Sequence, residues 1–376
     1  MFSIWEQQSF QEEIDLIVVG AGITGLFTAL HYQRRFPTHR VRLLERGPHP
    51  AGASVKNAGF ACFGSPSEIL ADIDAEGLDA ALSRVEERWL GLQEMRAELG
   101  DENIGFESTG GHELYSEGDP LYTRVADRFD ELNRSLLPIF SQPAYEWRTT
   151  RKSDLGLNTG HIARTALEGP IDTGAMMRTL LNKTIAMGVD VRFQQTVTEL
   201  VSEGDTALIR LSDGNAMKAS FVVVATNGYT SSLFPGIDVV PGRGQVLLTS
   251  AVPGLRLKGT FHMNEGYYYF RDYRGRVMLG GGRHLDKVGE TTTDDAITPL
   301  IQGSLERILR EVILPGRDFT VERRWSGVMG FRTRGKTPMI EHLSPRIIIA
   351  AGLSGMGIAI GTRVAQKAVE LVATSQ

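Results

Sequence analysis

IDLIVVGAGITGLFTALHYQRRF, residues 14–36, joins a short apolar run to a glycine-rich turn and then to an amphipathic segment. The run from Ile14 to Val19 predicts a buried strand, and Leu26, Ala29 and Leu30 lie on one side of the helix expected after the turn. A strand, a tight turn and a helix in this order form the first half of a nucleotide-binding βαβ unit.

The glycines of the turn have the spacing GxGxxG, at Gly20, Gly22 and Gly25. In such a motif the first glycine permits the tight turn, the second lets the backbone approach a pyrophosphate, and the third lets helix and strand pack closely. Ile23 and Thr24 begin the helix, whose free amides and positive dipole end favour phosphate. We expect these five residues to bind a dinucleotide.

A second apolar strand, RVRLLE at residues 40–45, follows the helix and ends on an acid. Glu45 comes twenty residues after Gly25, where a carboxylate accepts hydrogen bonds from a ribose 2′-hydroxyl. A lone glycine motif is weak evidence, but strand, turn, helix, strand and acid occur here in the order of a Rossmann unit. The alternative is a glycine-rich turn in an unrelated α/β protein.

The composition is that of an ordinary globular protein. The 376 residues are 41% hydrophobic and 23% charged, which suffices for a large core and two domains. A net charge of −5 argues against nucleic acid or an anionic membrane as a partner. With Cys62 as the only cysteine, no intrachain disulfide or tetrathiolate site forms, and we expect no metal. No signal-peptide pattern or apolar stretch of about 20 residues is present, so we expect a cytoplasmic protein.

The segment after the second strand, ERGPHPAGASVKNAGFACFG at residues 45–64, is a loop of small residues rather than another βα unit. It has neither a helical period nor the alternation of a strand. Small residues let a ligand approach the backbone. Ser54, Lys56 and Asn57 carry polar groups that reach phosphate or the heteroatoms of a flavin ring lying under the loop.

This loop resembles that of the D-amino-acid-oxidase-like FAD family, which includes glycine oxidase, sarcosine oxidase and γ-glutamylputrescine oxidase. In that family a glutamate and a basic residue, here Glu45 and Arg46, precede a small-residue motif like GASVKNAGF, residues 52–60. The resemblance extends over essentially the whole chain. It implies FAD as the cofactor and an amine or amino acid as the substrate.

Three further segments are similar to the family's nucleotide domain. Residues 169–201 read as a helix opened by Asp172 or Thr173, followed by a strand from Val189 to Phe193. FVVVATNGYTSSLFPG, residues 221–236, reads as a strand that returns to the cofactor after a hairpin turning at Asp213 and Gly214. RIIIAAGLSGMGIAIGTRVAQKAVELV, residues 346–372, reads as strand, glycine loop and helix.

The resemblance implies that this last helix meets the pyrimidine end of the flavin, where N–H groups favour the negative charge of the reduced ring. Close packing of the helix on its sheet is the alternative explanation of its glycines. The cofactor-binding residues expected after the first turn are Glu45, Arg46, Ser54, Lys56, Asn57, Ala58, Val197, Ala225, Thr226, Gly228, Gly352, Gly355, Met356, Gly357 and Ile358.

A second dinucleotide motif is not expected. RVMLGGGRHLDKVGETTT, residues 276–293, has three glycines after a strand, but no helical pattern follows them. Electrons should therefore enter from a small substrate and leave to oxygen or another acceptor. We expect an α/β fold, with a Rossmann-type FAD-binding domain (residues 1–85, 160–235 and 330–376) and a mixed-sheet α+β substrate domain (residues 86–159 and 236–329).

Three residues are expected to contact the substrate. Strand period puts Tyr267 and Tyr269 on one face and Tyr268 and Phe270 on the other. In glycine-oxidase-like relatives a tyrosine of this strand helps hold the substrate carboxylate, and Tyr267 is the match. Arg332, in GFRTRGKTPMI at residues 330–340, matches an arginine that forks onto that carboxylate above the flavin. The alternatives are tyrosines that only pack and a solvated basic loop.

Two departures from the family imply noncovalent FAD. Sarcosine-oxidase-like relatives attach flavin through a cysteine just before the TP segment, and residues 328–333 contain none. Dimethylglycine-dehydrogenase-like relatives use a histidine near the position of Lys56, and residues 50–111 contain none. Cys62 is expected to be a small buried packing residue beside the cofactor loop rather than a redox centre.

The resemblance implies hydride transfer from the α-carbon of an amine or amino acid to flavin N5, with hydrolysis of the resulting imine. No general base is named, because none is required if the amine enters neutral and the eight histidines show no convincing placement. Two alternatives remain open: an FAD-dependent oxidase of an aminomethyl group on tRNA, which would need a basic track, and a flavin-bound protein without catalysis. The substrate's identity and the oligomeric state are not indicated.

Overall fold

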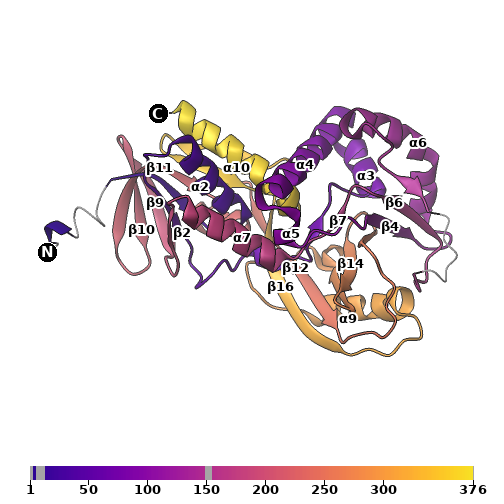
Figure 1. Cartoon of the computed structure of the whole chain (residues 1–376). Coiled ribbons are helices and arrows are strands. Elements are labelled where there is room, and N and C mark those ends of the chain that lie inside the picture. The colour runs from indigo at the N-terminus through magenta and orange to yellow at the C-terminus, as the bar shows by residue number, and fades with distance from the viewer. Residues whose placement is uncertain (1–2, 6–12, 149–154, 376) are drawn as a thin grey trace.

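The computed structural model describes residues 3–5, 13–148 and 155–375 and contains two large sheets with helices around them (Figure 1). The first sheet runs in the order β17-β18-β11-β1-β2-β8, and β10 and β9 extend from β11 as a hairpin. Its strands are β1 (Ile14–Val19), β2 (Val41–Leu44), β8 (Asp190–Arg192), β9 (Val197–Glu203), β10 (Thr206–Leu211), β11 (Ala216–Val224), β17 (Met339–Ser344) and β18 (Ile347–Ala351).

Strand β1 is buried on both faces, as its continuous apolar sequence requires. Leu16 and Val18 pack with helices α2 (Ile23–Arg35), α7 (Thr173–Ala186) and α10 (Gly357–Thr374), whereas Ile17 and Val19 pack with the β9–β10 hairpin on the opposite face. β1 pairs in parallel with β2 and β11. The predicted Rossmann-type unit is therefore confirmed, and the carboxyl ends of its strands meet at one edge.

The second sheet is mixed, as predicted, with the order β16-β12-β15-β14-β13-β4-β6-β5 and one parallel pair, β13 with β4, among the described strands. Its strands are β4 (Gly111–Tyr115), β5 (Glu146–Trp147), β6 (His161–Thr165), β12 (Val240–Thr249), β13 (Thr260–Met263), β14 (Tyr268–Tyr273), β15 (Arg276–Gly281) and β16 (Val321–Phe331). A small pair, β3 (Phe60–Ala61) with β7 (Gly169–Pro170), lies apart from both sheets.

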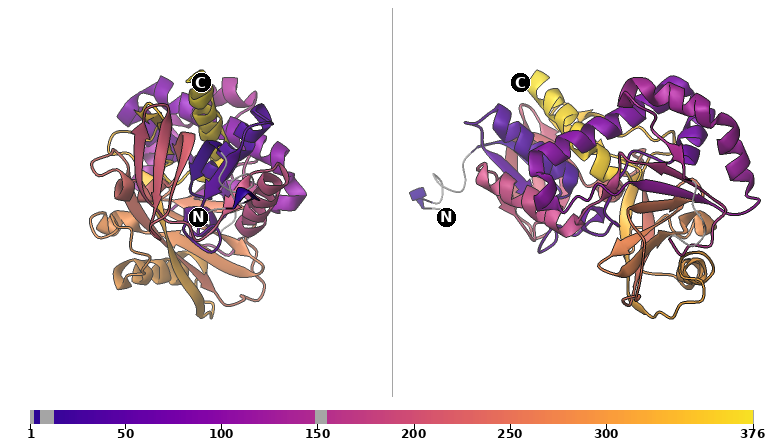
Figure 2. Two further views of the ribbon diagram at one scale, coloured as in Figure 1. Left: turned by 90° about the vertical axis from the view of Figure 1, so that its left-hand side faces the viewer. Right: turned by 45° about the vertical axis from the view of Figure 1, so that its right-hand side comes forward.

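The remaining helices cover the second sheet and join it to the first. Helix α9 (Pro299–Ile308) continues as one wider turn through Leu309–Ile313, while α3 (Pro66–Glu76), α4 (Leu78–Leu99) and α6 (Pro120–Phe140) form an arch above the sheet (Figure 2). Two short helices are α5 (Asp101–Ile104) and α8 (Thr230–Leu233). Strands β16 and β12 of the second sheet contact the 3₁₀ turn Asn227–Tyr229 that follows β11 of the first sheet.

Sheet membership differs from the expected division of the chain in two places. Strand β6 belongs to the second sheet, although residues 160–235 were assigned to the nucleotide domain. The second half of α4 packs into the core of the first sheet through Leu92, Met95 and Leu99, although residues 86–159 were assigned to the substrate domain. A helix of 22 residues is about 33 Å long, so it reaches from one core to the other.

Candidate active site

A cavity of about 430 Å³ opens at the carboxyl ends of β1, β2 and β11 and is referred to below as the nucleotide cavity. Gly20 has a φ of +105°, and a Cβ there would lie 3.0 Å from the Ala225 carbonyl oxygen. At Gly25 a Cβ would lie 1.9 Å from the carbonyl oxygen of Gly20. Both positions therefore require glycine. Gly20, Gly22, Ile23 and Thr24 line the cavity, whereas Gly25, expected to bind the cofactor, lines neither cavity and instead lets α2 pack closely on the turn.

Glu45 lies at the end of β2 and is buried beside the first turn. Its Oε2 accepts a hydrogen bond from the Ala21 amide (2.9 Å), and its Oε1 accepts one from the Gly47 amide (2.9 Å). These bonds orient the carboxylate while leaving further lone pairs for a ligand hydroxyl. Arg46 also lines the cavity, and its guanidinium stacks 3.8 Å above the ring of Tyr229.

The small-residue loop uses its polar groups mainly to hold itself in place. Ser54 Oγ accepts a hydrogen bond from the Ile23 amide (3.0 Å), so the serine caps the first helix. The Asn57 amide group donates to the carbonyls of Ala53 and Ser54, and its Oδ1 accepts from the Gly59 amide and from Thr173 Oγ1. Lys56 extends to an ion pair with Asp295 and lines a second cavity instead of the first.

The glycine loop before α10 faces both cavities. Gly355 and Ile358 line both, Gly357 lines the nucleotide cavity, and Met356 lines the second. No described residue accepts a hydrogen bond from the amides of Gly357 and Ile358, which begin an 18-residue helix. Free amides at a helix N-terminus favour a ligand atom with negative charge.

The other expected cofactor residues divide between the cavities and the backbone around them. Val197, Ala225 and Thr226 line the nucleotide cavity, and Ala58 lines the second. Gly228 lines neither, since it packs against the Met329 carbonyl, 2.4 Å from where a Cβ would lie. Gly352 also lines neither cavity, but its bare Cα makes room for the side chain of Arg332.

The second cavity, of about 460 Å³, is referred to below as the substrate cavity. It adjoins the nucleotide cavity, because Ala53, Asn57, Met329, Gly355 and Ile358 line both. Its floor is bare backbone of the second sheet, at Gly244, Gly281 and Gly327. A space of this kind at the edge of a nucleotide site is where a small ligand would meet the reactive end of a cofactor.

Arg332 follows the last residue of β16 and lines the substrate cavity. Its Nε donates to Asp238 Oδ2 (2.9 Å), and Asp238 Oδ1 accepts from the amide and hydroxyl of Thr333. Hydrogen bonds from Thr333 and from Arg332 lower the pKa of Asp238 to about 2. The terminal nitrogens of Arg332 donate no hydrogen bond to a described residue. Asp238 therefore orients the guanidinium through Nε and leaves both terminal nitrogens free for a ligand. Asp238 carries no motif that singles it out in the sequence.

The two tyrosines lie as the strand period predicted. Tyr269 is within β14 and lines the cavity with Tyr267, whereas Tyr268 and Phe270 point into the core beneath the sheet. Burial raises the pKa of Tyr269 to about 12, so its hydroxyl stays protonated at neutral pH. Tyr267 lies one residue before β14 and is 36% exposed, with its ring 4.6 Å from that of His284.

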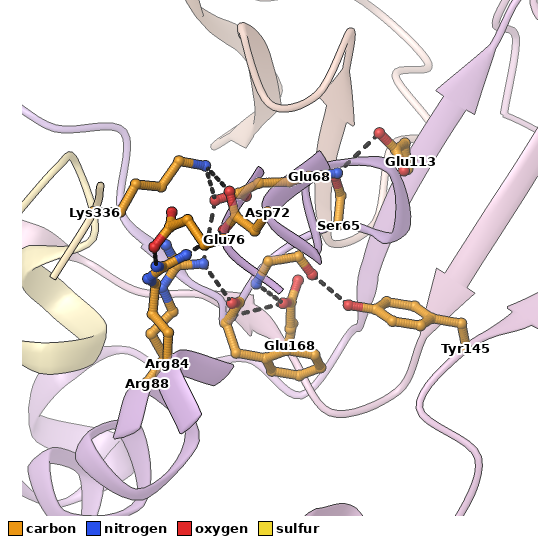
Figure 3. Close-up of polar contacts among 12 residues, drawn as sticks. Ser65, Glu68, Asp72, Glu76, Arg84, Arg88, Glu113, Tyr145, Glu168 and Lys336 are labelled. Atoms are coloured by element: carbon orange, nitrogen blue, oxygen red, sulfur yellow. Dashed lines mark hydrogen bonds and ion pairs between the residues drawn. The ribbon is translucent and has the colours of Figure 1, made fainter. Parts of the chain in front are cut away.

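A buried ion network closes the side of the substrate cavity (Figure 3). Glu68, Asp72 and Glu76 recur on one face of α3, which we call the acidic face. Arg88 and Arg84 of α4 pair with this face at 3.2 Å (Glu68) and 2.8 Å (Asp72), and Lys336 lies 2.6 Å from Asp72. Burial disfavours the charge of Glu68, but Arg88 and Lys336 outweigh it and lower its pKa to about 2. The network ties the loop that follows Arg332 to helix α3.

Two further buried glutamates in this region are protonated more readily than usual. Glu168 accepts the Phe63 amide (2.8 Å), and burial raises its pKa to about 8 despite that bond (Figure 3). Glu113 accepts from Ser65 and Ser67, and burial raises its pKa. Neither residue is marked by a sequence pattern.

His262 and Cys62 line the substrate cavity and are buried. Both ring nitrogens of His262 are without a hydrogen-bond partner among the described residues, and burial lowers its pKa to about 4. Burial also raises the pKa of the Cys62 thiol, so the reactive thiolate is disfavoured. The expected burial of Cys62 is confirmed, whereas its place in the cavity was not foreseen.

Two kinds of feature are absent from the described residues. None of their helices is long and apolar enough to cross a membrane. No group of three or more His, Cys, Asp or Glu side chains among them is arranged to hold a metal ion.

A family model described as FAD dependent oxidoreductase (DAO) matches residues 15–371. The chain belongs to this family of FAD-dependent oxidoreductases. It is similar in structure to L-proline dehydrogenase from P. horikoshii, with a TM-score of 0.77, 17% identity, and coverage of 98% of this chain and 95% of that one. It is also similar to glycine oxidase from Geobacillus kaustophilus (TM-score 0.75, 19% identity, 97% and 95% coverage) and to iminodiacetate oxidase from Chelativorans sp. BNC1 (TM-score 0.71, 19% identity, 96% and 95% coverage). At these identities the likeness establishes a common fold.

The residues of the two cavities fit the FAD that the family uses. Gly20 and Gly22 present bare backbone to the nucleotide cavity, and Glu45 offers a carboxylate to a ribose. The amides of Gly357 and Ile358 have no described partner and lie where the cavities join. Two adjoining cavities that contain a free carboxylate acceptor and free N–H groups suit a dinucleotide carrying a flavin.

Proposed function

We propose that this enzyme oxidises an amino acid, or another amine that carries a carboxylate, to the imine, which water then hydrolyses. The observation that carries the proposal is Arg332: an acid orients its guanidinium through Nε, and its terminal nitrogens remain available beside a cavity that adjoins the nucleotide cavity. Two parallel N–H donors match the geometry of a carboxylate. The family and the likeness to glycine oxidase and L-proline dehydrogenase agree with this substrate class.

The FAD would be held by Gly20, Gly22, Glu45 and the loop from Ser54 on the nucleotide side, and by the α10 amides on the flavin side. When bound, FAD supplies the two-electron acceptor that takes the hydride from the substrate's α-carbon. We infer that it is bound noncovalently, because residues 328–333 hold no cysteine and residues 50–111 no histidine. Acid precipitation should release all of the FAD into the supernatant, and flavin retained by the precipitated chain would contradict this.

The chain's own contribution is to bind, orient and exclude water. Arg332 would fix the carboxylate, and Asp238 would keep the guanidinium plane in one orientation. Tyr269, protonated at neutral pH, presents a hydroxyl to the same cavity. Phe60, Met329 and Ile358 line the cavity with apolar groups, which favour the neutral amine over the ammonium form and lessen the need for a strong base.

Anaerobic mixing of the purified holoenzyme with a panel of amines would test the proposal, with bleaching of the flavin absorbance as the measurement. The panel should pair each amino acid, in both enantiomers, with its decarboxylated amine. We expect bleaching by at least one amino acid and much slower bleaching by the matching amine. Faster bleaching by the decarboxylated amines would reject the carboxylate requirement.

A further inference from the structure

Arg283 is a second arginine of the substrate cavity, and nothing in the sequence singled it out. It begins a 3₁₀ turn (Arg283–Asp286) directly after β15 and lines the cavity with Arg332. Its guanidinium lies 4.3 Å from the centre of the Phe331 ring. The slot that holds it is shaped by Gly242, where a Cβ would lie 2.9 Å from Arg283 Nε and 2.4 Å from the Phe331 ring.

The charge of Arg283 is not neutralised by the described part of the chain. Most other cations of the cavity have an acid: Lys56 pairs with Asp295, Arg332 with Asp238, and Lys336 with Asp72. Arg283 forms no ion pair with a described residue, and its Nε is buried without an acceptor.

The one carboxylate that acts on Arg283 among the described residues, Glu290, is already engaged. Glu290 binds Arg243 through both oxygens, at 2.8 Å each. Burial accordingly lowers the pKa of the Arg283 guanidinium, although Tyr267 and Glu290 oppose this effect. Arg283 is half-buried, and a charge withdrawn from water without a partner is costly. The fold therefore keeps a cation in the cavity wall at a cost that a bound anion would offset.

A second cation lies at the same end of the cavity. Lys287 Nζ is 5.7 Å from the centre of the Tyr267 ring and forms no ion pair with a described acid. Tyr267 stands beside Arg283 and supplies a hydroxyl. Two cations and a phenol around one end of a small cavity are the donors that recognise a carboxylate.

We propose that Arg283, with Tyr267 and Lys287 beside it, binds a second acidic group of the substrate, so that the enzyme prefers an amine with two carboxylates. This inference rests on the proposed function, in which Arg332 takes the carboxylate next to the oxidised carbon. Arg283 is then the residue that determines specificity, and an amino acid with an acidic side chain is the simplest substrate of this class.

Equilibrium binding to the holoenzyme tests the inference without any turnover. The probes are glutarate, with two carboxylates, and butyrate, with one, titrated by calorimetry into wild type and Arg283→Gln. We expect glutarate to bind about 30-fold more tightly than butyrate in wild type, as for a buried charge pair. Arg283→Gln should abolish that preference and leave butyrate affinity unchanged.

Two further variants serve as controls for Arg283→Gln. Arg283→Lys keeps the charge but not the planar fork, and it should retain part of the preference. Arg323→Gln, an exposed residue of β16, should behave as wild type. Equal affinity for the two probes in wild type would overturn the inference. So would an Arg283→Gln variant that loses both probes equally, since Arg283 would then hold the only carboxylate or support the fold.

Turnover supplies the second readout and separates the two proposals. With glutamate and norvaline in both enantiomers as substrates, Arg283→Gln should raise KM for glutamate about 30-fold and leave norvaline unchanged. If no amino acid bleaches wild-type flavin while glutarate still binds through Arg283, the proposed function fails and the acidic subsite stands. If amino acids are oxidised with no preference for an acidic side chain, the subsite fails and the function stands.

Discussion

The two cavities of this enzyme are built in different ways. The nucleotide cavity is formed by contiguous turns, in which Gly20, Gly25 and the loop before α10 shape the backbone. Above its glycine floor, the substrate cavity has walls of side chains that come from helix α3, strands β12 to β16 and the loop after β16. Backbone walls tolerate little change in the residues that form them, whereas side-chain walls change with single substitutions. We therefore call the nucleotide cavity the fixed site and the substrate cavity the adjustable site.

The largest effect on stability and FAD binding should come from adding one methyl group beside the first turn of the fixed site. Gly25→Ala places a Cβ 1.9 Å from the Gly20 carbonyl oxygen, which cannot rotate away as a side chain would. We expect a loss of about 3 kcal/mol or more in the free energy of unfolding, as for severe overpacking, together with loss of bound FAD. Urea unfolding and flavin content measure this. Gly52→Ala is the control, because Gly52 lines the nucleotide cavity and no atom lies within 4 Å of where its Cβ would be. Equal behaviour of the two variants would contradict the backbone argument.

A smaller but selective effect is expected at Arg332 in the adjustable site. Arg332→Ala should lower kcat/KM for carboxylate substrates about 30-fold or more, since a buried carboxylate loses its partner. Arg332→Lys should retain part of the wild-type kcat/KM, because a lysine keeps the charge but not the two coplanar donors. Arg334→Ala, at an exposed position of the same loop, should leave kcat/KM unchanged. Bleaching rates with an amino acid and its decarboxylated amine measure the selectivity. Equal losses for both would mean that Arg332 supports the cofactor or the fold instead.

A substitution of Glu45 tests whether FAD binding at the fixed site depends on a side chain as well as on the backbone. Glu45→Ala removes a charged acceptor worth roughly 1.5 to 3 kcal/mol, so FAD affinity should fall at least about tenfold. Titration of apoprotein with FAD gives the dissociation constant. Because Glu45 also accepts the Ala21 and Gly47 amides, unfolding should be measured in parallel. An unchanged affinity would show that another group meets the ribose.

Glu168 should make stability depend on pH. Its pKa is about 8 in the fold against an ordinary 4.5, so the folded state keeps a proton that the unfolded chain releases. The free energy of unfolding should therefore fall as pH rises from about 4.5 to about 8 and lose no more from this group above that range. Glu168→Gln keeps an acceptor for the Phe63 amide and should be more stable than wild type at pH 8, with a smaller difference near pH 5. The urea concentration at the midpoint of unfolding should be measured for both proteins at both pH values. A difference in stability that is the same at pH 5 and pH 8 would contradict the raised pKa of Glu168.

The smallest effect is expected at Cys62. Cys62→Ser buries a hydroxyl in place of a thiol and should cost about 1 kcal/mol of stability while keeping bound flavin and turnover. Thermal unfolding and the amine panel measure this. A folded, flavin-loaded variant without turnover would show that the thiol takes part in the chemistry.

The difference between the two cavities also explains which parts of the site could be predicted from the sequence. The βαβ unit, the acid at Glu45 and the last glycine loop were predictable because each is a contiguous pattern with one backbone geometry. His262 and Arg283 were not, because strand pairing brings them to the substrate cavity from segments far apart in the chain. Asp238 was not, because it meets Arg332 only through the pairing of β12 with β16. Lys56 was expected at the cofactor, but its ion pair with Asp295 places it on the substrate side.

The bare floor of the substrate cavity has a consequence for how such an enzyme could evolve. At Gly281 a Cβ would meet the Tyr267 carbonyl at 2.0 Å, so selection must keep glycine there. At Gly244 the one close neighbour of a Cβ would be the terminal methyl of Met329, at 2.8 Å, and that methyl moves by a bond rotation. A single codon change to alanine at 244 would therefore reduce the space for substrate by one methyl group without disturbing the sheet. Position 244 is where a descendant lineage could narrow its range of substrates in one mutational step.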